Sequence, residues 1–408
     1  MSFASVPLGE IAEINPLHRE AVDPETEVSF LGMADVSELG TTTSGENRVY
    51  GEVRTGYTPF RTGDVLVAKI TPCFQNGKIA QAQLEREIGA GSTEFHVVRA
   101  SKEVNARYLL RFLRQDWIRV EGELRMTGSG GQRRVPEAYL RELMIPLPPI
   151  TKQKQIAAVL DQVDTLRAKR REAIALLDNL TQSIFLDMFG DPVSNDRGWE
   201  RVRMGDLLAS IESGKSPQCL DRQAADGEWG VLKLGAVTQR VYLQDENKAL
   251  PSGVVPDARH EVRAGDLLFT RKNTPNLVAA SAYVRSTRSR LLMPDLIFRL
   301  VVADNAPVDK VYLHALLTQA GKRRKLQKLA SGSAASMVNI SKSKLLEFVC
   351  EVPPLALQRK FAQLIEAVEA QRDVHRNHLA TLDELFTSLQ HRAFSGTLWD
   401  HETTGEAA

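Results

Sequence analysis

Hydrophobic residues along the chain follow two alternating patterns. Short apolar runs, broken by Gly, Pro and polar clusters, predict strands in two separate stretches. The runs lie at 28–31, 64–68 and 95–98 in the first stretch, and at 230–234, 267–270 and 296–300 in the second. A helix is predicted after each set, from about Asn105 and about Asp309. Because the strands come without regularly alternating helices, each stretch predicts a mixed α/β domain with a curved, partly antiparallel sheet.

A helical spacing of apolar residues follows each stretch. Apolar residues three or four apart predict a long helix after Pro148-Pro149 and another after Pro353-Pro354. The apolar stripes run from Ile156 to Met188 and from Phe361 to Leu389. Each helix is a rod of about 50 Å, too long to bury its stripe alone. We therefore expect the two rods to form an antiparallel coiled coil, with packing of each rod on its own α/β domain as the alternative.

The two series are copies of one unit. Val6 recurs as Val202, Gly63-Asp64 as Gly265-Asp266, Tyr108-Leu109 as Tyr312-Leu313, and Pro148-Pro149 as Pro353-Pro354. The offset between matching positions grows steadily along the chain, as expected when the second copy of a duplicated domain has gained a few loop residues. We divide the chain into a first α/β domain (1–150), a first long helix (151–190), a second α/β domain (191–354), a second long helix (355–396) and a disordered tail (397–408).

Composition indicates a two-domain globular protein. The 408 residues exceed the size at which single cores usually stop growing, and the composition is 43% hydrophobic and 25% charged. No apolar run approaches the ~18 residues of a membrane span, and the N-terminus does not resemble a secretory signal, so we expect a cytoplasmic protein without membrane contact. Three widely spaced cysteines, Cys73, Cys219 and Cys350, indicate reduced thiols and neither disulfides nor a zinc site.

The net charge of +1 hides an uneven distribution of charge. Between residues 259 and 344, 16 Lys and Arg residues oppose 5 Asp and Glu residues. Within this stretch, Lys322, Arg323, Arg324 and Lys325 follow one another at the end of a predicted helical segment. Such a cluster is a candidate for contacts with nucleic-acid phosphates, where each neutralised phosphate releases condensed counterions. The alternative is an ordinary solvated helix face.

The order of α/β domain, long helix, α/β domain and long helix resembles the specificity subunit of Type I restriction–modification systems. The resemblance covers almost the whole chain, to about Gly396, and depends on an ordered set of pieces that occurs twice. In the first copy these pieces are 6–11, 60–66, 128–135, and 145–149 with Gln153 and Ile156. The resemblance implies that each α/β domain is a target recognition domain for one half of a split DNA sequence, and that the helices set the gap between the halves.

The resemblance also implies which partners the chain works with. They are double-stranded DNA, two methyltransferase subunits and the motor-nuclease restriction subunits. The chain itself would carry no chemistry, and the residues agree. The sequence lacks the methyltransferase motif that holds a flipped adenine and the glycine-rich loop that binds ATP phosphates, and the elements of a common nuclease motif occur in the wrong order. We therefore predict a protein that is not an enzyme and that needs no cofactor or metal.

Two kinds of loop supply candidate DNA contacts. A polar loop follows the Gly-Asp strand of each copy, where amides and cations suit base edges and phosphates. A Gly/Ser loop near the basic helix of each copy lets backbone amides approach phosphates. The polar-loop candidates are Lys69, Gln75, Asn76 and Lys78 in the first copy and Arg271, Lys272, Asn273 and Asn276 in the second; the Gly/Ser-loop candidates are Gln132, Arg133 and Arg134 in the first and Ser333 and Ser336 in the second. The alternative is that these segments are plain surface turns.

The second polar loop lacks the Asn-Gly-Lys ending of the first. Because the two copies differ where they would meet DNA, we predict that the protein reads an asymmetric, bipartite target. Two further interpretations stay open at this point. One is a coiled-coil scaffold or a decoy that counteracts restriction, and the other is a recognition partner for a single-chain restriction–modification enzyme.

Overall fold

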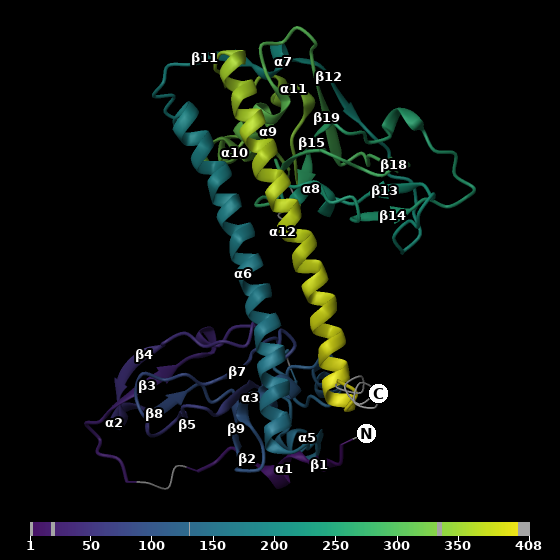
Figure 1. The fold of residues 1–408 in the computed structure, drawn as a ribbon. Helices are drawn as coiled ribbons and strands as arrows, with labels where there is room; N and C mark the ends of the chain where they lie inside the picture. The colour runs from purple at the N-terminus through teal and green to yellow at the C-terminus, as the bar shows by residue number, and fades with distance from the viewer. Residues whose placement is uncertain (1–2, 18–20, 130, 333–336, 399–408) are drawn as a thin grey trace, which may run out of the picture. The chain divides into compact units, whose positions relative to one another are not determined.

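The structure is a computed structural model that describes residues 3–17, 21–129, 131–332 and 337–398. The chain forms two compact units: unit 1 comprises Met1–Arg171 with Asn377–Ala408, and unit 2 comprises Glu172–Arg376. Two long helices, α6 (Ile150–Phe189) and α12 (Leu355–Ser395), each contribute one part to each unit and are drawn in teal and yellow in Figure 1. Most of the predicted tail at 397–408 lies outside the described residues.

The α/β part of unit 1 contains two four-stranded sheets. One has the order β2-β9-β6-β7 with antiparallel neighbours, and the other has the order β4-β3-β8-β5, in which β3 and β8 are parallel. A further antiparallel pair joins β1 to β10. The strands are β1 (Ser5–Pro7), β2 (Ala12–Ile14), β3 (Glu27–Leu31), β4 (Glu46–Val49), β5 (Thr58–Arg61), β6 (Val65–Ala68), β7 (Ile79–Gln81), β8 (Ile88–Gly91), β9 (Phe95–Ala100) and β10 (Met144–Pro146).

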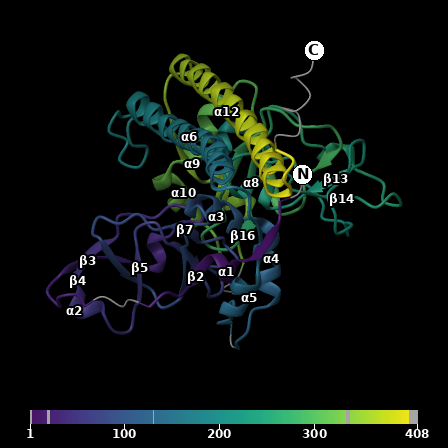
Figure 2. The ribbon, with the colours of Figure 1, turned by 60° about the horizontal axis from the view of Figure 1, so that its bottom comes forward.

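Unit 2 repeats this plan with a smaller second sheet. Its four-stranded sheet has the order β12-β19-β15-β17, and its three-stranded sheet has the order β14-β13-β18, with β13 beside β14 in Figure 2. Two antiparallel pairs join β11 to β21 and β16 to β20. The strands are β11 (Glu200–Arg203), β12 (Leu208–Ser213), β13 (Gly230–Leu232), β14 (Asn247–Ala249), β15 (Leu267–Thr270), β16 (Lys272–Asn273), β17 (Ser281–Tyr283), β18 (Leu291–Leu292), β19 (Ile297–Val302), β20 (Val338–Asn339) and β21 (Val349–Val352).

Short helices connect these strands. Unit 1 contains α1 (Leu8–Ile11), α2 (Tyr50–Val53), α3 (Ala106–Leu113), α4 (Asp116–Leu124) and α5 (Glu137–Glu142), and unit 2 contains α7 (Met204–Leu207), α8 (Gly235–Thr238), α9 (Lys310–Thr318), α10 (Ala320–Gln327) and α11 (Lys342–Leu346). The single helix predicted after each strand set is two helices in both units. The break occurs where Gln115 (ψ 139°) and Gln319 (ψ 132°) adopt non-helical backbone angles. The mixed α/β class predicted from the sequence is confirmed.

Equivalent side chains in the two units hold the start of each long helix. Gln153 of α6 is buried, and its side chain accepts from the N–H of Asn105 at 2.7 Å and donates to the carbonyl of Pro148 at 2.9 Å. Gln358 of α12 likewise accepts from the N–H of Asp309 at 2.8 Å and donates to the carbonyl of Pro353. These bonds satisfy buried amides, and they fix each long helix to the α/β part of its own unit.

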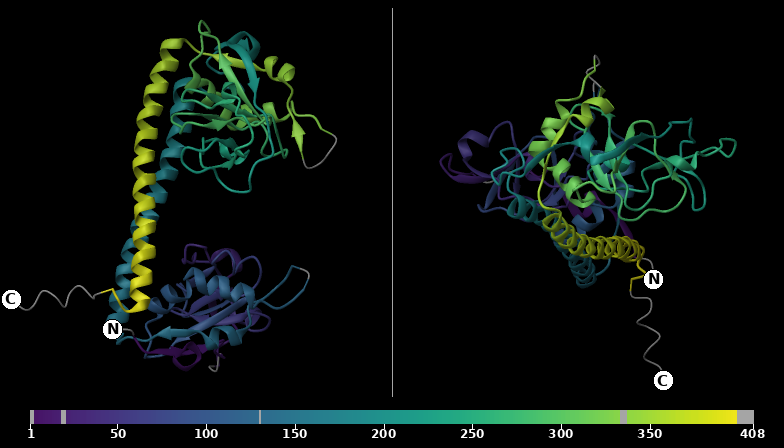
Figure 3. Two further views of the ribbon diagram at one scale, coloured as in Figure 1. Left: turned by 90° about the vertical axis from the view of Figure 1, so that its right-hand side faces the viewer. Right: turned by 90° about the horizontal axis from the view of Figure 1, so that it is seen from above.

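Within each unit, the segments of α6 and α12 lie side by side and run antiparallel, as can be followed in Figure 3. In unit 1, Arg167 of α6 pairs with Asp383 of α12 at 2.6 Å. In unit 2, Arg372 of α12 pairs with Asp178 of α6 at 2.9 Å, and the ring centroids of Phe185 and Phe361 lie 5.8 Å apart. The predicted antiparallel pairing of the long helices is therefore confirmed. The α/β part of each unit covers part of the apolar stripe, while Leu166, Leu364 and Leu385 are exposed.

Candidate functional site

The polar loop and the Gly/Ser loop of the first copy lie against each other in unit 1. The N–H of Thr71 donates to the carbonyl of Arg133 at 2.9 Å, and the N–H of Val135 donates to the carbonyl of Lys69 at 2.9 Å. Ile70 and Arg134 form an isolated antiparallel bridge. We call these segments, 69–78 with 126–129 and 131–135, loop pair 1. The fold thus brings together two segments that the sequence offered only as separate candidates.

The same two segments meet in unit 2. Strand β16 pairs with β20, the N–H of Ile340 donates to the carbonyl of Arg271 at 2.8 Å, and Nε of Arg271 donates to Oδ1 of Asn339 at 3.0 Å. We call these segments, 271–276 with 331–332 and 337–340, loop pair 2. Ser333 and Ser336 lie outside the described residues. Because both copies form the pair, it is a property of the duplicated fold.

One arginine holds the polar loop of each pair. Arg119 of α4 donates from Nη1 to the carbonyl of Gln75 at 2.8 Å. Arg323 of α10 donates from Nη2 to the carbonyl of Asn276 at 2.6 Å, and burial lowers the pKa of its guanidinium. Both arginines are half-buried, and each holds the turn of the loop that carries a candidate base-reading amide.

These two contacts change the interpretation of two arginines in the sequence. Arg323 was a candidate phosphate contact, but its guanidinium is directed at the loop. Arg119 belongs to a weaker basic segment that the first copy has in the equivalent place, but it is not one of the candidate DNA contacts named above. The sequence does indicate that Arg119 and Arg323 are equivalent, because Arg119 follows Tyr108 at the same interval as Arg323 follows Tyr312.

Lys322 requires a correction. It is 2% exposed, forms an ion pair with the buried Glu351, and donates from Nζ to the carbonyl of Val349 at 2.9 Å. A buried and paired ammonium cannot reach a phosphate, so the predicted role of Lys322 does not hold. Its neighbours Arg324 and Lys325 are exposed on α10, and they keep the charge that a phosphate contact needs.

The polar-loop candidates of unit 1 differ in how available their side chains are. Lys78 donates from Nζ to the carbonyl of Met33 at 2.9 Å, so its charge serves the fold. Gln75 donates to Sδ of Met126 at 3.6 Å, and its buried Oε1 has no hydrogen-bond donor among the described residues. Lys69 is half-buried and Asn76 is exposed. Asn76 is therefore the polar-loop amide best placed to meet a ligand.

In the Gly/Ser loop of unit 1, the two arginines are engaged and the glutamine is not buried. Arg134 forms a two-bond pair with Glu94, at 2.7 and 2.9 Å, and this pairing holds the pKa of the Glu94 carboxyl below its usual range. Arg133 donates from Nη2 to the carbonyl of Glu123 at 2.9 Å. Gln132 is exposed at the tip. The arginines shape the loop that presents Gln132.

Loop pair 2 has fewer available side chains. Asn273 is buried, with its Nδ2 donating to Oγ1 of Thr238 at 3.3 Å. The Arg271 guanidinium lies over the Phe298 ring at 5.1 Å. Lys272 is half-buried, and Asn276 is exposed. Asn276 is thus the counterpart of Asn76 in unit 2.

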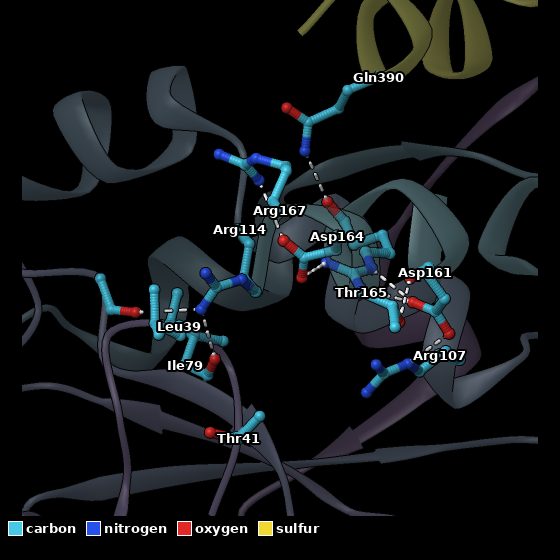
Figure 4. Close-up of polar contacts among 12 residues, drawn as sticks. Leu39, Thr41, Ile79, Arg107, Arg114, Asp161, Asp164, Thr165, Arg167 and Gln390 are labelled. Atoms are coloured by element: carbon cyan, nitrogen blue, oxygen red, sulfur yellow. Dashed lines mark hydrogen bonds and ion pairs between the residues drawn. The ribbon is translucent and has the colours of Figure 1, made fainter. Parts of the chain in front are cut away.

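A charge network in unit 1 accounts for the arginines of α3, as Figure 4 shows. Arg107 pairs with Asp161 of α6 at 2.7 Å, and Arg111 pairs with Asp164 at 2.8 Å. Arg114 donates to the carbonyl of Ile79 at 3.0 Å, and burial lowers the pKa of its guanidinium to about 10. Arg107 and Arg111 thus join α3 to α6, and Arg114, directly after α3, binds backbone carbonyls, so none of the three is presented to a ligand.

Two kinds of feature are missing from the part of the chain that the structure describes. Its His, Cys, Asp and Glu side chains form no group of three that could hold a metal ion. Within the same residues, no helix combines the length and the apolar character that crossing a bilayer requires.

Comparison with known proteins decides the family. Residues 2–176 match the family described as Type I restriction modification DNA specificity domain. The chain is 31% identical to the Type I restriction enzyme EcoEI specificity subunit of Escherichia coli, in an alignment that covers 88% of this chain and 76% of that protein. The chain belongs to the Type I restriction–modification specificity subunits.

Other relatives agree. The EcoAI specificity subunit of Escherichia coli is 37% identical over 43% of this chain and 32% of its own length. Among solved structures, the S subunit of a Type I restriction–modification system from M. genitalium superimposes with a TM-score of 0.58 at 14% identity, over 97% of this chain and 96% of that one. A chain from a structure that describes assembly of the type I R-M system gives 0.52 at 21% identity, over 97% and 98%. These similarities confirm the fold of a specificity subunit.

Proposed function

We propose that this specificity subunit reads an interrupted, asymmetric DNA sequence, with loop pair 1 reading one half and loop pair 2 the other. The observation that carries the proposal is that both units form the same pair of loops, held by equivalent arginines, but with different exposed side chains. Asn76 and Gln132 are exposed in loop pair 1, whereas Asn276 is exposed in loop pair 2. Amide side chains can pair with the donor and acceptor pattern of adenine in the major groove.

In this proposal, cations around the loops bind the DNA backbone. Arg324 and Lys325 are exposed on α10, the same helix that carries Arg323. Their phosphate contacts would strengthen binding to every sequence and make it depend on salt. Five further cations add positive potential near the bases: Lys69, Lys272, Arg133, Arg134 and Arg271. The hydrogen bonds of the three arginines also shape the loops.

The recognition domains in this proposal are residues 1–150 and 191–354, and the long helices at 151–190 and 355–396 join them. The subunit is not itself an enzyme. It acts in the cytoplasm with two methyltransferase subunits and with restriction subunits, which supply the chemistry. The family of the chain supports these partners, since the curated relatives are named as specificity subunits of restriction enzymes.

The proposal is tested with the complex of this chain and its methyltransferase subunits. Methyl transfer is measured on a library of duplexes with randomised sequence, and the modified duplexes are sequenced. The expected motif has two unlike halves separated by unspecified bases. Asn76→Ala and Gln132→Ala should relax base preference in one half, and Asn276→Ala should relax it in the other. A continuous motif, or relaxation of both halves by one of these substitutions, would refute the assignment.

A further inference from the structure

A groove of about 320 Å³ opens in unit 2. Helix α9 forms one side with Val311, Ala315 and Thr318, and the parts of α6 and α12 that belong to unit 2 form the other. The segments 239–242 and 283–286 close the rim. The volume is at the lower end of the range typical of ligand pockets, which is enough for one or two side chains of a partner.

Three long side chains stand at the equivalent positions of unit 1. The residues that correspond to Val311, Ala315 and Thr318 are Arg107 and Arg111 of α3 and Arg114 directly after it, at matching intervals from Tyr312 and Tyr108. In unit 1 these arginines cross to Asp161 and Asp164 of α6 or to the carbonyls of Gly77 and Ile79. Small side chains replace three long ones in unit 2, so the groove follows from the sequence of the second copy.

Three arginines of the groove have hydrogen-bond donors without an acceptor among the described residues. Arg240 and Arg285 make no ion pair or side-chain hydrogen bond with another described residue, although Arg285 lies over the Tyr283 ring. Arg372 is 4% exposed, and its Nε has no acceptor among the described residues. In unit 1, Nε of the equivalent Arg167 donates to an aspartate at 2.6 Å. Arg240, Arg285 and Nε of Arg372 therefore have donors in the groove without a partner acceptor among the described residues.

The acidic side chains of the groove do not serve as acceptors for Arg240 and Arg285, because each already pairs with another arginine. Asp178 and Glu369 both bind Arg372, and Asp373 pairs with Arg376 at 3.3 Å. These carboxylates also restrict the type of anion that fits. A nucleic-acid backbone carries closely spaced charges and would meet them, whereas a single carboxylate can sit beside Arg240 and Arg285 without doing so. The apolar floor of the groove suits the side chain next to that carboxylate.

We propose that this groove binds an acidic side chain, Asp or Glu, from a protein segment of one methyltransferase subunit. The inference rests on the proposed function for the identity of the partner. It adds an asymmetry that the duplicated fold does not predict. Since the chain's own arginines stand at the equivalent positions of unit 1, one of the two methyltransferase subunits should depend on the groove and the other should not.

The test reverses the charge of the groove in the full chain. The double variant Arg240→Glu with Arg285→Glu removes no ion pair of the fold, so it should be as stable as the wild type, which circular dichroism checks. The variant is co-expressed with the methyltransferase subunit of its restriction–modification system, and native mass spectrometry counts the subunits. Wild-type chain should hold two methyltransferase subunits. The variant should hold one, with binding of the second weakened at least tenfold.

The matched control makes the same change of charge on α10, with Arg324→Glu and Lys325→Glu. This control should keep both methyltransferase subunits and lose DNA affinity. A groove variant that keeps both subunits with unchanged affinity would refute the inference, and so would one that keeps both and instead loses DNA affinity, which would assign the groove to phosphate. A wild-type chain that binds no methyltransferase subunit would refute the proposed function, and the inference with it.

Discussion

The arginines that hold the polar loops provide a sharp prediction about specificity. Arg119→Met and Arg323→Met keep the length and the apolar stem of each side chain and remove the guanidinium. Arg119→Met removes the side-chain donor to the carbonyl of Gln75 in unit 1, and Arg323→Met removes the charged donor to the carbonyl of Asn276 in unit 2, which keeps the bond from Nε2 of Gln327 at 3.0 Å. The loops carry the exposed amides, so loosening a loop should affect base reading before it affects overall binding.

The magnitude follows from the geometry. A hydrogen bond from a charged donor contributes about 1.5–3 kcal/mol when buried, and less when the donor is partly solvated. Arg119 has a side chain that is 37% exposed, so we expect a loss of about 1–2 kcal/mol. That loss corresponds to roughly a 5- to 30-fold reduction in the preference for the correct base. Arg119→Lys and Arg323→Lys, which keep a charged donor, should recover part of it.

The assay is methyl transfer by the assembled complex on duplexes with single base changes. Arg119→Met should reduce discrimination in the half-site of unit 1, and Arg323→Met in that of unit 2, with the salt dependence of binding unchanged. Arg86→Met is the control, because Arg86 forms an exposed pair with Glu27 at 2.6 Å. Uniform weakening on all sequences, together with a smaller salt dependence, would show that these arginines contact phosphates and would refute the positioning role.

Three further predictions address the surroundings of the site. Lys322→Met should lower the free energy of unfolding by about 3–5 kcal/mol in urea titrations, because the buried Glu351 then keeps only a 3.7 Å contact with the exposed Arg201, and adding Glu351→Leu should restore most of the loss. Replacing Arg324 and Lys325 by Gln should weaken binding to all duplexes. It should also reduce the slope of the logarithm of affinity against the logarithm of salt concentration by about 2. Selective loss of binding at one base pair would contradict a phosphate role. His314 has a pKa lowered from 6.5 to about 4, chiefly by burial, so the unfolded chain binds more protons between these values and stability should fall as pH drops through this window. His314→Gln should show a weaker fall, and an equal one would refute the assignment.

The sequence predicts the architecture of this chain because duplication provides each signal twice. The Pro-Pro pairs, the apolar stripes and the repeated Gly-Asp turn gave the two α/β parts and the two long helices. The turn shows why the repeat is informative. Gly63 and Gly265 adopt φ of 95° and 88°, and the aspartate after each accepts from the N–H of Arg61 or Arg263 at 2.8 or 2.9 Å.

The sequence predicts the roles of individual charged residues less well. Lys322 and Arg324 stand in the same basic run, but one side chain is buried against Glu351 and the other is exposed. Sequence alone does not distinguish them, because the partner of Lys322 comes from a distant strand. The arginines of α3 show the same effect, since Arg111 is 3% exposed and is paired with α6.

Genome-wide mapping of modified bases tests the central claim most directly. Cells with the gene for this chain are compared with cells that lack it, and with cells that carry the Asn276→Ala variant. We expect one interrupted motif with unlike halves, present with the gene and absent without it, and relaxed in a single half by the variant. An unchanged modification pattern on deletion of the gene, or a motif without a gap, would contradict the claim that each unit reads half of the target.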